Sequence, residues 1–137
     1  MHLVLALNAE LPQDWVVDAT ARFATQTGST VAVVCVDEVQ LERLAPVQRS
    51  VYVGRAEEAT TAAVQRLEEA GVEATGTVLN GLARELVLDF AEEQSADIIV
   101  VGASDRPALA TRLLGSVPLA IVAGSARPVL VITRPRH

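Results

Sequence analysis

Lysine is absent from this chain of 137 residues, and aromatic residues make up only 3% of it. Without lysine, the chain can form no Schiff base with a carbonyl substrate and has no phosphate-binding loop of the usual lysine-containing kind. The two histidines, His2 and His137, stand at opposite ends of the sequence, so we expect no catalytic histidine. One cysteine and two terminal histidines also supply no recognisable metal-binding cluster.

Other features that the sequence lacks limit the expected cellular compartment and the classes of binding partner. The single cysteine, Cys35, has no second cysteine with which to form an internal disulfide, which suits a reducing cytoplasm. The amino-terminal residues lack the features of a signal peptide. A net charge of −6 repels phosphate backbones, so nucleic-acid binding is not expected. The apolar runs are far shorter than the roughly 18 to 20 residues needed to cross a bilayer, so no membrane span is expected.

Half of the residues are apolar, and short apolar runs alternate with amphipathic stretches along the whole length. The runs predict strands buried on both faces, and the amphipathic stretches predict helices. The predicted strands cover residues 3–7, 30–36, 72–79, 96–102 and 128–132. The predicted helices cover residues 13–26, 55–70, 82–94 and 116–123, and residues 38–54 are predicted to be irregular. This order predicts one α/β domain over residues 1–137, with a five-stranded parallel sheet and helices on both faces.

In such a sheet, ligands bind beyond the carboxyl ends of the strands, at the point where the strand order reverses. One corresponding loop follows the first strand and begins with Asn8, Ala9 and Glu10. The other follows the fourth strand and begins at Gly102. The first loop contains no glycine, which excludes a dinucleotide-binding turn. A phosphoacceptor receiver domain is excluded as well, because Asn8 stands where an acid is needed and the chain has no lysine.

The segments ADIIVVGASDRP, LLGSV and RPVLVI resemble the carboxyl-terminal half of the universal stress protein family. Members of that family that bind ATP carry G-x-x-G, nine residues, and then G-S or G-T. Gly102 takes the first place here, residues 106–114 form the spacer, and Gly115 and Ser116 close the motif. The resemblance implies a Rossmann-like three-layer sandwich of the adenine-nucleotide α-hydrolase type, with strand order 3-2-1-4-5. It also implies a role in stress response through binding of ATP or a related adenine nucleotide, with Mg²⁺.

The physical chemistry of the motif agrees with a phosphate site. Gly102 allows a ligand to approach the backbone, and Gly115 and Ser116 precede a helix whose free N–H groups favour anions. Arg106 and Arg112 either contact phosphates or are solvated surface residues. By resemblance, the backbone of Val36 contacts the adenine. The predicted nucleotide-binding residues are Asn8, Ala9, Val36, Gly102, Asp105, Arg106, Gly115, Ser116 and Val117.

Two departures from the family pattern leave alternatives open. Asp105 replaces the second glycine of the motif, where a carboxylate repels phosphates unless a metal ion or an arginine intervenes. Asn8 replaces the usual aspartate, and Glu10 replaces a hydroxyl residue. The alternative to a nucleotide-binding module is therefore a dimeric protein-interaction module without nucleotide. A slow ATPase is a third hypothesis, for which Asp105 is the only candidate base; no other catalytic residue is recognised.

The remaining predictions concern packing and assembly. Cys35 is interpreted as an inert core residue, and Trp15 as packing against the sheet. Asp37 either reaches a ribose hydroxyl or is solvated, as acids that end strands usually are. The helix at residues 116–123 is apolar almost all round, which predicts burial on two sides. Family members commonly dimerise through the last strand, which implies a homodimer through Val129 and Val131 and an unknown protein partner.

Overall fold

The computed structural model describes residues 1–8, 13–37, 49–103 and 116–135, in which five strands alternate with helices. The first half of the chain contains β1 (His2–Leu7), α1 (Asp14–Thr27), β2 (Thr30–Asp37) and α3 (Arg49–Glu69). The second half contains β3 (Ala74–Asn80), α4 (Ala83–Glu93), β4 (Ile98–Gly102), α5 (Ser116–Gly124) and β5 (Val129–Ile132). The predicted α/β class is confirmed.

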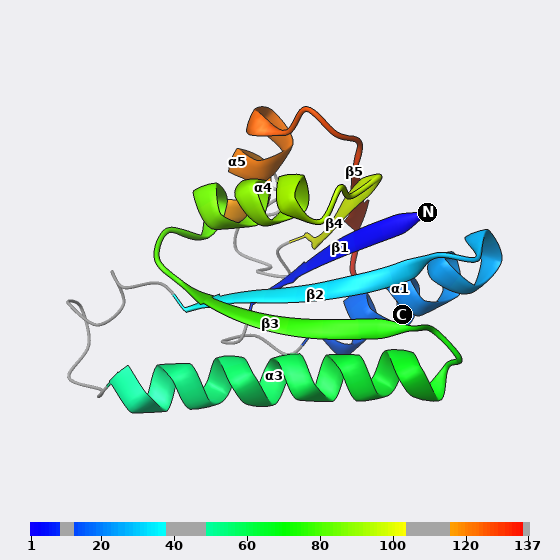
Figure 1. Ribbon diagram of the computed structural model, residues 1–137, viewed down its shortest axis with the longest axis horizontal. Coiled ribbons are helices and arrows are strands. Elements are labelled where there is room, and N and C mark those ends of the chain that lie inside the picture. Colours follow the sequence, from blue (N-terminus) through cyan, green and yellow to red (C-terminus); the bar gives the residue numbers. More distant parts are fainter. Residues whose placement is uncertain (9–12, 38–48, 104–115, 136–137) are drawn as a thin grey trace.

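The five strands form one parallel sheet in the order β3-β2-β1-β4-β5, as predicted (Figure 1). From β1 the chain builds outward through β2 to β3, then returns to the other side of β1 for β4 and β5. The strand order therefore reverses between β1 and β4. This is the position at which open parallel sheets bind ligands, beyond the carboxyl ends of the strands.

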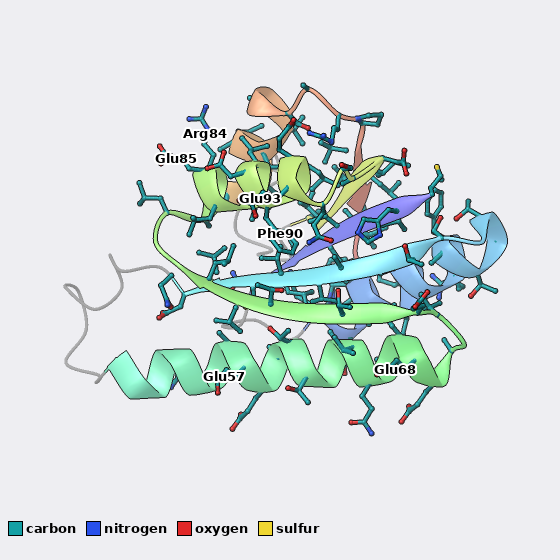
Figure 2. The ribbon with its side chains drawn as sticks, in the orientation of Figure 1. Glu57, Glu68, Arg84, Glu85, Phe90 and Glu93 are labelled. Atoms are coloured by element: carbon teal, nitrogen blue, oxygen red, sulfur yellow. The ribbon has the colours of Figure 1, made fainter. Side chains whose placement is uncertain are left out.

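Helices cover both faces of the sheet, with α1 and α3 on one face and α4 and α5 on the other (Figure 1). Alternation along β2 sends Val31 and Val33 into the core beneath α1 and α3, and Ala32 and Val34 into the core beneath α4. Phe90 points from α4 toward the sheet, whereas Glu57 lies on the outer side of α3 (Figure 2). Cys35 is fully buried in β2, which confirms its prediction as a core residue.

Helix α3 begins earlier than its sequence indicates. Residues 49–54 are helical, so the prediction of an irregular segment over 38–54 is wrong there; residues 38–48 lie outside the described part of the chain. The buried side chains of α3 (Ala56, Thr60, Ala63 and Leu67) recur at helical spacing against the sheet. The helix continues through Gly54, at a cost of roughly 1 kcal/mol relative to alanine.

Helix α5 is buried on one side only, which corrects the prediction of burial on two sides. Ile121 is fully buried, whereas Leu119 is 55% exposed and Val122 is 40% exposed. The helix therefore presents apolar side chains to solvent next to the edge of the molecule formed by β5. Among the described residues, no helix combines the length and the apolar character needed to cross a membrane.

Candidate functional site at the carboxyl edge of the sheet

The carboxyl ends of the three central strands bring together three of the predicted site residues. Leu7 pairs with Cys35, and Ala6 pairs with Val101, in the parallel registers of β1 with its two neighbours. One position further along, Asn8 stands beside Val36, and Gly102 stands beside the end of β1. The structure therefore places Val36 near the end of β2, Gly102 at the end of β4, and Asn8 directly after β1, which lies between them.

Helix α5 begins at Ser116, as predicted, and its next residue is Val117. Val117 is partly buried and packs against the apolar core beneath α4 and α5, the same core that Val36 contacts. The unpaired N–H groups of the first turn of such a helix favour anions. The other predicted residues (Ala9, Asp105, Arg106 and Gly115) lie outside the described part of the chain.

Gly102 has a structural reason to be glycine apart from any ligand. A Cβ atom at this position would stand 2.6 Å from Cγ2 of Val16 and 3.1 Å from Nε2 of Gln13. The ring of Trp15 would lie 3.6 Å away. The lack of a side chain therefore lets the start of α1 pack directly on the end of β4. Trp15 is partly buried against the core beneath α1, so its predicted packing role is confirmed.

Gln13 belongs to this edge, although the sequence did not single it out. It is the residue before α1, and its Oε1 atom accepts a hydrogen bond from the backbone N–H of Asn8 at 2.9 Å. The contact depends on how α1 is placed against β1, and a glutamine that precedes a helix gives no sequence signal of it. Its Nε2 atom also lies beside Gly102, at the end of β4 on the other side of the switch point.

Asp37 is buried, which corrects the alternative in which it is a solvated acid. Its side chain is only 4% exposed, at the carboxyl end of β2. Asp37 pairs with Asn80 of β3, and its carbonyl accepts a hydrogen bond from the N–H of Gly81 at 3.1 Å. Strand alternation places it on the face covered by α1 and α3, so it is a buried polar group near the edge. The alternative in which it reaches a ribose hydroxyl stays a prediction.

Helix α1, which carries Gln13 at its start, is attached to α3 by an ion pair. Nε and Nη2 of the Arg66 guanidinium donate hydrogen bonds to the two carboxylate oxygens of Asp18, at 2.5 Å and 3.0 Å. This charged hydrogen bond lowers the pKa of Asp18 below its ordinary value and raises the pKa of Arg66. The pair therefore helps to hold α1 in the position from which Gln13 and Val16 contact the ends of β1 and β4.

The described part of this edge offers backbone groups and polar side chains. No group of three or more His, Cys, Asp or Glu residues suited to a metal ion occurs among the described residues. His2 lies at the opposite end of the sheet, where its ring contacts Thr30 at 2.6 Å and Gln94 at 3.0 Å. The chemistry available at the carboxyl edge is therefore hydrogen bonding to a small polar ligand and attraction of an anion by α5.

Comparisons with known proteins agree with this geometry. A model of the universal stress protein family matches residues 1–133. A universal stress protein of Methanocaldococcus jannaschii is 36% identical over 69 residues, which are 50% of this chain and 41% of that relative. The matched segment thus spans less than half of the relative's length.

Solved structures share the fold over almost the whole chain. A universal stress protein from Archaeoglobus fulgidus superposes with a TM-score of 0.76 at 24% identity, covering 96% of this chain and 93% of that one. A structure from the same organism in complex with dAMP has a TM-score of 0.71 at 24% identity, covering 96% and 97%. A family protein from Arabidopsis thaliana with AMP bound has a TM-score of 0.73 at 15% identity, covering 98% and 92%.

Proposed function

This chain belongs to the universal stress protein family, and on that premise we propose that it binds an adenine nucleotide at the carboxyl edge of its sheet. The observation that carries the proposal is the placement of Asn8, Val36 and Gly102 at the carboxyl ends of three adjacent strands, at the switch point. Proteins of the same fold bind AMP and dAMP, which supports an adenine nucleotide as the ligand. The proposed role is a nucleotide-responsive module in stress response, and it involves no covalent chemistry.

In detail, we propose that the base and ribose lie near Asn8, Ala9 and the backbone of Val36, and that the phosphates face the start of α5. The phosphate-binding residues would be Gly102, Arg106, Gly115, Ser116 and Val117. The N–H groups of the first turn of α5 support an anion there. Asp105 opposes it electrostatically, so ATP binding through this loop would need Mg²⁺ or Arg106 to offset the carboxylate.

Equilibrium binding of AMP and of ATP, with and without Mg²⁺, tests this proposal on the parent protein and on Asp105→Gly. We expect the parent to bind AMP, and Asp105→Gly to bind ATP more tightly than the parent when Mg²⁺ is absent. The Mg²⁺ dependence of ATP binding should be weaker in the variant, because the repelling carboxylate is gone. If neither protein binds either nucleotide at millimolar concentration, nucleotide binding is excluded.

A second function is favoured by the apolar surface of α5. Leu119 and Val122 are exposed, and the neighbouring strand β5 is the last strand of the sheet. Exposed apolar groups beside a sheet edge suit pairing with another chain. We propose a homodimer through β5, with Val129 and Val131 at its centre, as the form in which a module without nucleotide would recognise a protein partner. A cytoplasmic location agrees with the single reduced cysteine.

A further inference from the structure

The side chain of Gln13 is turned away from the helix that it precedes. A residue in this position usually caps the helix with a side-chain oxygen, but Gln13 makes no such bond among the described residues. Its backbone carbonyl instead accepts hydrogen bonds from the N–H groups of Val16 at 2.9 Å and Val17 at 3.2 Å. The start of α1 is therefore held by main-chain bonds, and the side chain contacts β1.

The amide group of Gln13 meets both strands that flank the switch point. Its Oε1 atom accepts from the N–H of Asn8, the residue that follows β1. Its Nε2 atom lies 3.1 Å from the place where a Cβ of Gly102 would stand, at the end of β4. One planar side-chain group thus bonds Asn8 and lies beside Gly102, two residues of the nucleotide site proposed above.

We propose that Gln13 is a positioning residue of that site, acting through the backbone of Asn8. The hydrogen bond from the Asn8 N–H fixes the direction in which the chain leaves β1, and so the position of the Asn8 side chain. The Nε2 atom of the same amide lies beside Gly102, at the end of β4. This inference rests on the proposed function, because it assigns Gln13 a part in binding the same nucleotide.

Two substitutions separate the hydrogen bond from the bulk of the side chain. Gln13→Met keeps the length but removes the acceptor, whereas Gln13→Glu keeps an acceptor for the Asn8 N–H. Gln65→Met is the matched control, because Gln65 is an exposed residue of α3 whose amide contacts only Glu69 among the described residues, at 3.4 Å. The probe is AMP, titrated calorimetrically, and the backbone amide of Asn8 is followed by two-dimensional NMR in the nucleotide-free protein.

For Gln13→Met we expect about fivefold weaker AMP binding, the effect of one ordinary hydrogen bond, and an upfield shift of the Asn8 amide proton. The unfolding midpoint should stay close to that of the parent, because the main-chain bonds of α1 remain. Gln13→Glu should return the Asn8 amide to its parent position. Gln65→Met should match the parent in both measurements.

Each other outcome overturns the inference in a recognisable way. If the parent binds AMP and Gln13→Met binds it equally well, the positioning role is lost while the proposed function stands. If the parent does not bind AMP, the proposed function fails and the inference fails with it. If Gln13→Glu leaves the Asn8 amide displaced, or if Gln13→Met shifts amides throughout α1 and lowers the unfolding midpoint, Gln13 is a structural residue only.

Discussion

At the scale of single residues, Gly102 shows that a glycine predicted to bind a ligand can also be required by packing. The sequence motif assigns it to close approach of a ligand, and the structure shows that α1 also approaches it closely. Val16, the side chain nearest to an added Cβ, is fully buried and has little room to move. A glycine at this place is therefore required by the fold whether or not a nucleotide is bound.

The contact of Gly102 with Val16 leads to a prediction about stability. We expect Gly102→Ala to lower the free energy of unfolding by about 1–3 kcal/mol, the usual cost of overpacking a core. In the double variant Gly102→Ala with Val16→Ala, the second substitution removes the clashing methyl groups. The two effects should therefore be less than additive, as measured by urea denaturation in a double-mutant cycle.

Gly54 provides the control for this cycle. It lies inside α3, and a Cβ there meets no described atom within 4 Å. Gly54→Ala should therefore stabilise the protein by up to about 1 kcal/mol through helix propensity. Strict additivity of the substitutions at positions 102 and 16 would show that the two residues do not compete for the same space.

At the scale of elements, the Arg66–Asp18 pair connects α3 with α1 and makes their docking depend on pH. The pKa of Asp18 is lowered in the folded state, so the folded protein binds fewer protons there than the unfolded chain does. Stability from this pair is complete above the unfolded pKa, about 3.9, and is lost as the pH falls through the lower folded pKa. Both partners are about half exposed, so solvent screening keeps the effect small.

We therefore expect Asp18→Asn to lower the thermal midpoint slightly at pH 7, by a few degrees at most. The difference from the parent should shrink as the pH falls below about 4, and also when salt is added at pH 7. Thermal denaturation followed by circular dichroism measures both trends. Glu57→Gln, at an exposed position on the outer side of α3, is the control, and an equal loss in that variant would assign the effect to net charge.

The hydrogen-bond pattern of β5 makes the proposed dimer testable. The N–H groups of Ile99 and Ala103 donate to the carbonyls of Pro128 and Ile132, so these even-numbered residues of β5 bond toward β4. In a parallel ladder the backbone groups of the residues between them, including Val131, then face away from β4. Proline at such a position removes an outward N–H without breaking a bond to β4.

We expect the parent to sediment as a dimer and Val131→Pro to sediment as a monomer. Val78→Pro is the matched control in β3, the outer strand on the other side of the sheet from β5. The N–H of Val31 donates to the carbonyl of Glu73, so in β3 the even-numbered Val78 has its backbone groups directed away from β2. A dimer that survives in Val131→Pro, or dissociates equally in Val78→Pro, would contradict association through β5.

At the scale of the whole molecule, patterns that depend on burial were predictable and contacts between elements were not. Apolar runs such as residues 96–102 identify strands because a central parallel strand is buried on both faces. The start of α3 at Arg49 is not apparent from the sequence, because Gly54 is a local signal against a helix and the helix continues through it. Similarly, the burial of Asp37 and the exposure of Leu119 depend on which elements cover them, and the sequence around each residue carries no mark of that.

Part of the candidate site was likewise predictable from the sequence, and part was not. The spacing of Gly102 from Ser116 follows the family pattern and indicates where the edge of the sheet and the start of α5 lie. The link from Gln13 to Asn8 joins residues of two different elements through a side chain that belongs to no motif. Such contacts follow from the angle between α1 and β1, which is set by the packing of Val16 and Val17 beneath the sheet. Sequence patterns therefore predict where the candidate site lies, and the structure adds contacts such as that of Gln13 with Asn8.

The central claim is that an adenine nucleotide binds at the carboxyl edge of this sheet, and an AMP titration followed by amide NMR tests it most directly. We predict saturable shifts at the backbone amides of Asn8, Val36, Gly102 and Val117. The amide resonances of Thr30 and Asp97, at the amino ends of the strands, should not shift. The claim would be contradicted by the absence of saturable shifts at millimolar AMP, or by shifts confined to the amino ends of the strands.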